Sequence, residues 1–374
     1  MAATAPRISE QKKTVANLEV VVDSEAAAEE AGLRYVSDRN TGYTRKRRGD
    51  DCEYFDADGE KITDEKRLMR IRRLAIPPAW DRVWICASPN GHLQATGYDA
   101  RRRRQYRYHE RWREVRDEAK YEKMVLFGQA LPKIRKRTEK DLSLPGLPRE
   151  KVLATIVELL ERTFIRVGNE EYAKENKSFG LTTLRNRHVD VEGITVHFQF
   201  RGKSGVKQEK EFTDRRVAKI IRKLQDLPGQ ELFQYLDDAD ERRSVTSQDV
   251  NDYLKEITGD DFSAKDFRTW AGTVLASLAL KTQQGFTTKK EAKAKLKDAI
   301  SAVAHMLGNT PAVCRKCYIH PIVLESYLDG TLVEALKQKT EETLLEKIDD
   351  LREEEIAVLK FLRNRLQKNA ESCA

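Results

Sequence analysis

The chain has 374 residues, of which 39% are hydrophobic and 35% are charged, and this is enough for two domains that each bury a core. No apolar run approaches the length that spans a bilayer, and Met1–Val21 lacks the continuous apolar core of a signal peptide. These features argue against a membrane or secreted protein. They predict a cytoplasmic protein with no membrane partner.

The cysteines favour a reducing compartment. They are odd in number and scattered, which argues against a disulfide framework: Cys52, Cys86, Cys314, Cys317 and Cys373. The spacing Cys314-x-x-Cys317 is compatible with zinc or redox chemistry, but no second Cys/His pair at ligand spacing accompanies it. We interpret the two as ordinary thiols on a helix, and we expect neither a metal nor a cofactor.

The formal net charge of +8 is unevenly distributed. Basic runs lie at Arg45–Arg48, Arg67–Arg73, Arg101–Arg104 and Lys133–Arg137, whereas Glu341–Glu355 is acidic. Such runs fit a polyanion such as nucleic acid, and the alternative for any one of them is a solvated face. After the third run, aromatic and amide side chains interleave with arginines and add flat contact surfaces. The predicted nucleic-acid contacts are Arg101, Arg102, Arg103, Arg104, Gln105, Tyr106 and Tyr108.

The N-terminal part of the chain is predicted to form a small β-rich domain. Residues 1–30 have no firm period and are expected to be a loose tail. Residues 31–115 carry short β-like patterns between turn signals. The expected strands lie around Tyr43, Tyr54 and Phe55, at Val83–Ile85 and at Leu93–Tyr98. Ile71–Ile76 resembles a short helix that Pro77 and Pro78 end.

A hydrophilic segment at Arg111–Lys120 is expected to lead into a second, mainly helical domain, residues 116–374. Its apolar residues recur at helical spacing in Val152–Phe164, Val217–Leu224, Ser247–Gly259, Ser263–Leu278, Ile300–Leu307 and Leu344–Leu366. The last of these, Leu344–Leu366, is interpreted as a packing or interaction helix. Glu353–Glu355 is expected to be an acidic break in it. Between the helices, Ile194–Phe200 and Val206–Phe212 alternate around a Gly202–Gly205 turn, which places Lys203 at the tip of a β-hairpin.

The segment Gly308–Tyr318 reads as a nucleophile on a defined support. Gly308 can end one helix, while Thr310 and Pro311 suit the N-cap and first position of the next. Tyr318 follows after this short helix. A buried structural tyrosine is the alternative reading.

Attack of a tyrosine on a phosphodiester needs positive donors that meet the non-bridging oxygens, and arginine suits this task. Arg166 follows an apolar helical run, and Arg268 lies on the helix that Ser263 caps. Expulsion of the sugar oxygen needs a proton, which Lys203 can supply from the hairpin. Such a site requires no metal.

Several motifs, in consistent order over Lys66–Tyr327, resemble the type IB DNA topoisomerases of the compact poxvirus and bacterial branch. They are Ile165–Gly168, Tyr172–Asn176, Gly180–Leu184, His188-Val189, Phe200–Lys203, Lys265–Thr269 and Gly308–Tyr318. The resemblance implies an α+β fold whose catalytic domain is of the kind shared with tyrosine recombinases. It also implies a C-shaped clamp around double-stranded DNA, and we expect a monomer associated with the nucleoid.

The resemblance also implies roles for single residues. Tyr318 would form a 3′-phosphotyrosyl bond and leave a 5′-hydroxyl, with Arg166 and Arg268 holding the phosphorus centre and Lys203 acting as the general acid. Asn309 stands where many members carry a histidine, and it can still donate one hydrogen bond. Because the phosphotyrosine conserves bond energy, the strand is rejoined without ATP.

His188 is expected to be structural or a DNA contact, not catalytic. The chain also lacks a Gly-x-x-x-x-Gly-Lys-Ser/Thr phosphate loop and a carboxylate cluster for magnesium. Both absences agree with a reaction that needs no ATP or metal.

Two other readings remain in view. A tyrosine recombinase shares the catalytic fold and the chemistry, so fold analogy does not separate the two. Recombinases usually place a histidine three residues before the second arginine, where this chain has Lys265, and their N-terminal domain is helical. A DNA-binding protein without activity is the third reading, and the complete set of catalytic residue types argues against it.

Overall fold

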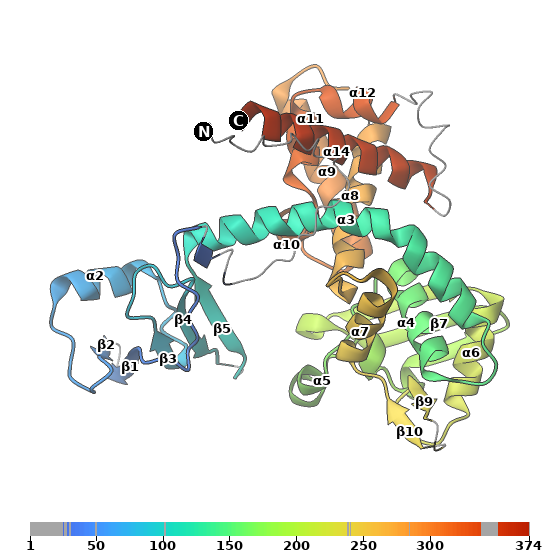
Figure 1. Cartoon of the computed structure of the whole chain (residues 1–374), viewed down its shortest axis with the longest axis horizontal. Coiled ribbons are helices and arrows are strands. Elements are labelled where there is room, and N and C mark those ends of the chain that lie inside the picture. The colour runs from blue at the N-terminus through green and yellow to red at the C-terminus, as the bar shows by residue number, and fades with distance from the viewer. Residues whose placement is uncertain are drawn as a thin grey trace, which may run out of the picture. The chain divides into compact units, whose positions relative to one another are not determined.

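The computed structural model describes residues 25, 28–29, 31–48, 51–100, 102–237, 239, 241–283, 285–337 and 351–373 (Figure 1). The chain divides into two compact units, Met1–Lys123 and Met124–Ala374. The predicted tail, residues 1–30, falls almost entirely outside the described residues. The domain boundary predicted between residues 115 and 116 stays a prediction.

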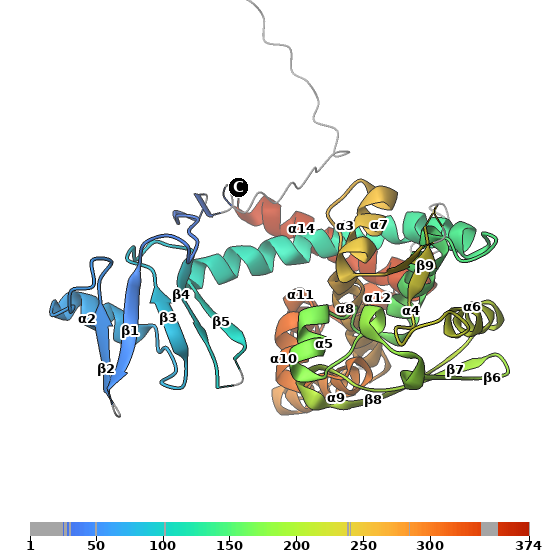
Figure 2. The ribbon, with the colours of Figure 1, turned by 90° about the horizontal axis from the view of Figure 1, so that it is seen from below.

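The first unit is built on an antiparallel five-stranded sheet with the order β2-β1-β3-β4-β5 (Figure 2). The strands are β1 (Tyr43–Arg48), β2 (Asp51–Phe55), β3 (Asp81–Ile85), β4 (Leu93–Tyr98) and β5 (Arg104–Tyr108). Helix α2 (Glu65–Arg73) packs on one face of the sheet. Its N-cap Asp64 accepts a hydrogen bond from the backbone N–H of Arg67 at 2.7 Å.

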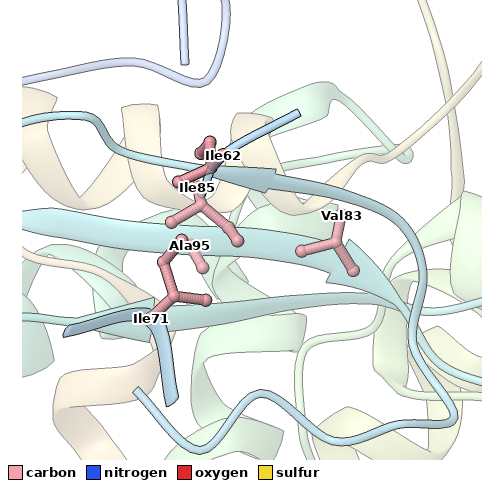
Figure 3. Close-up of a cluster of buried hydrophobic side chains, with 5 residues drawn as sticks. All are labelled: Ile62, Ile71, Val83, Ile85 and Ala95. Atoms are coloured by element: carbon pink, nitrogen blue, oxygen red, sulfur yellow. The ribbon is translucent and has the colours of Figure 1, made fainter. Parts of the chain in front are cut away.

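The small core of this unit lies between α2 and the sheet (Figure 3). It consists of Ile62, Ile71, Val83, Ile85 and Ala95. Val83 and Ile85 share one face of β3, because successive strand residues point to opposite faces. The opposite face of the sheet is thereby left for side chains that do not serve this core.

Part of the prediction for this unit is wrong. The helix expected at Ile71–Ile76 is α2, which begins at Glu65 and ends at Arg73. The prediction missed its first turns because they are mostly charged and show no apolar pattern. The expected contact segment Arg104–Tyr108 is strand β5, and the expected connecting segment Arg111–Lys120 lies in helix α3 (Glu110–Leu142); neither assignment contradicts the role predicted for the segment.

The second unit is mostly helical. Its helices are α4 (Arg149–Thr163), α5 (Glu170–Asn176), α6 (Arg215–Gln225), α7 (Ser247–Thr258), α8 (Ala264–Thr282), α9 (Lys289–Leu307), α10 (Pro311–Cys317), α11 (Pro321–Leu328), α12 (Thr331–Lys337) and α14 (Glu353–Cys373). Short 3₁₀ turns are η1 (Leu181–Thr183), η2 (Asn186–His188) and η3 (Lys203–Gly205). Thus the coarse prediction of a mixed fold, with an N-terminal sheet and a mostly helical remainder, is confirmed.

The predicted hairpin is part of a three-stranded antiparallel sheet. Its strands are β6 (Val189–Glu192), β7 (Thr195–Arg201) and β8 (Lys207–Thr213), in that order. Strand β6 was not predicted, because it is short and carries two acidic residues. A separate two-stranded ribbon pairs β9 (Gln234–Leu236) with β10 (Arg242–Ser244).

Helix α8 is the centre of the second unit, since it packs against α4, α7, α9, α11, α12 and α14 (Figure 1). Its N-terminus has the predicted cap, in which Ser263 and Asp266 form a capping box. Small residues at Gly272 and Thr273 allow neighbouring segments to approach closely. Within the described ranges, no helix is both long and apolar enough to cross a bilayer.

The last helix differs from its prediction at Leu344–Leu366. Residues 338–350 lie outside the described ranges, and α14 runs from Glu353 to Cys373. Glu353–Glu355, expected as a break, is the first turn of α14. Acidic side chains there are favoured by the positive end of the helix dipole.

Glu355 anchors α14 to the rest of the unit. It is only 6% exposed and accepts hydrogen bonds from both terminal nitrogens of Arg135, each at 2.9 Å. It also accepts one from the indole N–H of Trp270 on α8 at 3.3 Å. The acidic start of α14 is therefore a packing contact with α3 and α8.

Candidate active site

Tyr318 is held at the end of a short helix by the residues that the sequence indicated. Gly308 ends α9 with a φ of 61°, in the left-handed region that glycine tolerates. Thr310 is the N-cap of α10, and Pro311 is its first residue. The backbone N–H of Tyr318 donates to the carbonyl of Cys314 at 3.0 Å. The phenol is half-buried.

Helix α8 supports Tyr318 from the other side. A Cβ placed on Gly272 would lie 2.6 Å from the Tyr318 carbonyl oxygen and 2.9 Å from its Cβ, which is too close for any larger residue. The Thr273 hydroxyl donates to the Tyr318 carbonyl at 3.2 Å and accepts from the His320 N–H at 3.0 Å. The backbone on both sides of the phenol is thereby fixed to α8.

Arg268 lies next to this phenol and is 3% exposed. Its Nη2 donates to the carbonyl of Leu307 at 2.7 Å, and its Nη1 donates to the carbonyl of Phe164. These two carbonyls belong to the ends of α9 and α4, so the guanidinium ties three helices together. The Arg268 Cζ lies 5.1 Å from the centre of the Tyr318 ring. Its buried Nε has no hydrogen-bond partner in the described part of the chain.

Arg166 and Asn309 form the other side of the site. Arg166 Nη2 donates to the side-chain oxygen of Asn309 and, at 3.5 Å, to the carbonyl of Gly308. Because Asn309 presents its oxygen to Arg166, its amide nitrogen remains as a donor. That nitrogen is buried and unpaired as far as the described residues extend.

The backbone around Arg166 is fixed by the loop that contains η1. The N–H of Leu181 donates to the carbonyl of Arg166 at 2.9 Å. A Cβ placed on Gly180 would lie 2.5 Å from that same carbonyl and 2.6 Å from the Gly168 Cα. Only glycine permits this approach. This explains in physical terms why glycines flank the arginine in the motifs.

The charges of the site act on the phenol. Burial raises the pKa of Tyr318, but the guanidiniums of Arg268 and Arg166 outweigh it, so the pKa lies below the ordinary tyrosine value. Burial and the charge of Arg166 in turn lower the pKa of Arg268. The two guanidiniums therefore stabilise negative charge on the Tyr318 oxygen and on an anion bound beside it.

Lys203 stands at the turn between β7 and β8, where Ser204 and Gly205 both have positive φ. Its side chain is exposed. The hairpin itself reaches the site, because Lys210 Nζ on β8 donates to the carbonyl of Met306 at 2.9 Å. Contacts therefore join Tyr318 with Arg268 and Arg166 with Asn309, and the charges of both arginines act on the phenol, while Lys203 is carried by an adjoining hairpin.

Sequence reasoning missed Lys210 and Thr273, and also the role of the carbonyls of Phe164 and Leu307. A signal for Lys210 existed, since it lies two residues before Phe212 and therefore shares a face of its strand with that apolar residue. The carbonyl partners of Arg268 had no signal, because backbone groups carry no residue-type information.

The predicted nucleic-acid contacts of the first unit lie on and beside β5. Tyr106 is 43% exposed and stacks on Tyr108 with ring centres 5.9 Å apart. The Arg104 guanidinium lies 5.4 Å from the Tyr106 ring centre and pairs with Asp38. This stacked surface offers flat faces and charge together.

The neighbouring residues of the basic run are engaged by an acid. Asp99 pairs with Arg103 at 2.7 Å and accepts from the Gln105 amide at 3.0 Å. Arg102 is exposed, and Arg101 lies outside the described residues. The run therefore presents less unpaired positive charge than its sequence implies. All of these residues stay predictions as DNA contacts.

His188 belongs to the interior of the loop around η2. It is buried, its Nδ1 accepts from the backbone N–H of Arg185 at 3.1 Å, and its ring centre lies 4.5 Å from that of Phe179. Burial, with Arg187 and Arg185, lowers its pKa to about 4, so the ring is neutral near pH 7. Its role as a DNA contact stays a prediction.

No three His, Cys, Asp or Glu side chains gather as a metal site among the described residues. Cys314 is buried and Cys317 is exposed, and neither is in a disulfide. The expectation that the reaction uses no metal stays a prediction.

Known proteins share both parts of this chain. Residues 109–347 match the family model "Eukaryotic DNA topoisomerase I, catalytic core", and residues 52–99 match "Bacterial DNA topoisomerase IB, N-terminal domain". The chain is 33% identical over 295 residues to "DNA topoisomerase 1B" of Acanthamoeba polyphaga mimivirus, which covers 76% of this chain and 87% of the relative. It is 23% identical over 256 residues to "DNA topoisomerase 1B" of Vaccinia virus (strain Copenhagen), with 68% and 78% covered.

The first family match includes Arg166, Lys203, Arg268, Asn309 and Tyr318 and ends before α14. Its extent, together with the identity to the mimivirus relative, settles the family of the whole described fold. The chain belongs to the type IB DNA topoisomerase family.

Proposed function

We propose that this DNA topoisomerase relaxes supercoiled duplex DNA through a transient 3′-phosphotyrosyl bond at Tyr318, followed by strand rotation and religation. The observation that carries the proposal is a pair of buried donors without hydrogen-bond partners among the described residues, Arg268 Nε and Asn309 Nδ2. Arg268 lies beside the Tyr318 ring, Asn309 contacts Arg166, and both guanidiniums lower the pKa of the phenol. Buried donors without partners are costly, and a phosphate oxygen is the acceptor that best suits a guanidinium.

Cleavage exchanges one phosphoester bond for another. The Tyr318 oxygen bonds to phosphorus as the bond from phosphorus to the 5′-oxygen breaks. The phenol proton passes to solvent, and the Lys203 ammonium gives a proton to the departing 5′-oxygen. Negative charge that builds on the non-bridging oxygens is met by Arg166, Arg268 and the Asn309 amide.

Religation is the reverse of this exchange. The 5′-hydroxyl attacks the phosphotyrosine, and the phenol is released. Since the two ester bonds are similar in energy, no ATP is consumed. The stoichiometry of cleavage and religation includes no redox partner and no metal. Between the two steps the broken strand rotates about the intact one.

The direct test is relaxation of a supercoiled plasmid in the presence of EDTA and without ATP. Stepwise loss of supercoils supports the proposal. Strand exchange restricted to matched sites would instead identify a recombinase, and retardation of DNA with neither relaxation nor a covalent adduct would identify a binding protein.

Lys203→Ala is expected to slow cleavage about 10²-fold to 10⁴-fold, the range for loss of a general acid. A substrate with sulfur in place of the bridging 5′-oxygen should largely restore the rate, because a thiolate leaves without a proton. Single-turnover cleavage of the two substrates measures this. Lys207→Ala is the matched control, since it removes an exposed lysine of the same hairpin that pairs with Glu209. Without rescue by sulfur, Lys203 is not the general acid.

Asn309→Ala is expected to slow cleavage about 10²-fold, as does loss of one donor to a developing oxyanion. Asn309→Asp keeps the shape and the acceptor for Arg166 but replaces the donor by a negative charge, so its loss should be larger. Single-turnover cleavage and religation rates check both variants. An unchanged rate for Asn309→Ala would remove this residue from the site.

We also propose that the two units enclose duplex DNA as a C-shaped clamp and that the second unit has the tyrosine-recombinase fold. The exposed side chains of Arg104 and Tyr106, with Tyr106 stacked on the half-buried Tyr108, support a DNA-facing role for β5. We expect a monomer that acts on chromosomal DNA in the cytoplasm, because one chain carries the full set of catalytic residue types.

A further inference from the structure

The inner face of the β7–β8 hairpin has two polar side chains where an apolar face is expected. On β7 the inner positions are Val196, Phe198 and Phe200, all buried. The residues opposite them on β8 are Phe212, Lys210 and Gln208, in that order toward the tip. Gln208 and then Lys210 are therefore the inner residues of β8 nearest Lys203.

Both polar side chains meet the segment that follows α9. Lys210 Nζ donates to the Met306 carbonyl at 2.9 Å. The Gln208 amide oxygen lies 3.0 Å from the position of a Cβ built on Gly308, and the Gln208 stem lies 2.8 Å from that of Gly202, the residue before Lys203. Strand β8 thus contacts Met306 and Gly308 through Lys210 and Gln208, and Gln208 also contacts the residue before Lys203.

The contacted segment also holds the reacting groups. The carbonyl of Leu307, one residue after Met306, accepts from Arg268, and Asn309 follows directly after Gly308. The hairpin therefore contacts the same short backbone segment that holds Arg268 and carries Asn309.

Placing a lysine at position 210 costs desolvation free energy that a purely structural contact would not require. Lys210 is half-buried, and an ammonium loses solvation there that a single carbonyl only partly replaces. Burial and the charge of Arg268 lower its pKa. A methionine would fill the same position without this cost, which argues that the contact serves geometry.

We infer that Lys210 is a positioning residue, which docks the β7–β8 hairpin on the end of α9 and so sets where Lys203 delivers its proton. The inference rests on the general-acid role proposed above for Lys203. Lys210 does not touch the scissile phosphate in this scheme. It acts through the placement of Lys203.

The test compares Lys210→Met with Lys210→Arg and with the control Lys207→Met. Lys207 lies on the same strand and loses the same charge, but it is exposed and faces away from α9. Lys210→Met should slow cleavage of the ordinary substrate about 10-fold to 100-fold, the range for a misplaced catalytic group. Lys210→Arg, which keeps a donor, should recover most of that loss, and Lys207→Met should cleave within about twofold of the wild-type rate.

The leaving group separates positioning from other roles. If Lys210 acts through Lys203, a bridging 5′-sulfur restores Lys210→Met to near the wild-type rate, as it does Lys203→Ala. Equal slowing on oxygen and sulfur substrates would mean that Lys210 supports Arg268 or the fold, and this overturns the inference. A wild-type rate for Lys210→Met overturns it as well.

Hydrogen exchange gives a second measurement that does not depend on activity. Amides of residues 199–209 should exchange faster in Lys210→Met than in the wild type, because the hairpin loses its contact with the end of α9. Exchange of the α8 amides should stay unchanged. Uniformly faster exchange means a folding defect and overturns the inference. Two negative results can be told apart. If sulfur does not rescue Lys203→Ala, the general-acid role proposed for Lys203 is wrong. If sulfur rescues Lys203→Ala but Lys210→Met cleaves at the wild-type rate, only the positioning role of Lys210 is wrong.

Discussion

Tyr318→Phe is expected to abolish the covalent protein–DNA adduct and plasmid relaxation while DNA binding stays nearly unchanged. The substitution removes one oxygen atom and keeps the ring, so the contact with Arg268 and the backbone bonds to α8 persist. Loss of the nucleophile should lower cleavage about 10⁴-fold or more, as in other enzymes with a covalent intermediate.

The measurement traps the adduct with denaturant on a labelled duplex and compares binding by gel retardation. Tyr235→Phe, on β9 of the same unit, is the matched control and should form the adduct normally. An adduct that persists in Tyr318→Phe would show that another nucleophile attacks. The exposed Cys317 is then the first residue to test, because it precedes Tyr318 directly.

Much of the support for Tyr318 was predictable because it depends on residue types with strong local preferences. Gly308 ends α9 in the left-handed conformation, and Thr310 and Pro311 begin α10, as the sequence indicated. The caps of α8 and the end of α7 at Gly259 follow the same rules. These are local effects, and a single sequence carries them in full.

Long-range features were not accessible in the same way. Arg268 is bound by two carbonyls that are 104 and 39 residues away, and nothing in a residue's type marks its carbonyl as a partner. Strand β5 was missed because it is polar on both faces at an edge of the sheet. Glu355 read as a break, since its partner Arg135 is 220 residues away.

Arg268→Ala carries the other large effect. It is expected to lower the cleavage rate about 10³-fold to 10⁵-fold, the range for arginines that stabilise phosphoryl transfer. The guanidinium holds the carbonyls of Phe164 and Leu307 and lowers the pKa of Tyr318, and in the proposed mechanism its Nε also donates to the phosphate. Without it, burial still raises the pKa of the phenol, and of the two guanidiniums only Arg166 remains to lower it.

Arg268→Lys separates charge from shape. A lysine keeps one positive charge but lacks the planar fork, so it cannot serve two carbonyls and a phosphate oxygen together. We expect this variant to remain at least about 10²-fold slower than the wild type. Single-turnover cleavage of the 5′-sulfur substrate is the measurement, because it removes the proton-transfer step and leaves nucleophile and phosphate stabilisation.

The control must separate catalysis from stability, since Arg268→Ala leaves two buried carbonyls unpaired. Each lost partner costs about 1–3 kcal/mol, which lowers the unfolding temperature without explaining a rate loss measured on folded protein. Arg365→Ala, on α14, removes an arginine that bonds Thr331 and should cleave normally. A wild-type cleavage rate for Arg268→Lys would show that a point charge suffices. The planar geometry of Arg268 would then serve the fold, and a single positive charge at this position, together with Arg166 and Asn309, would stabilise the phosphate.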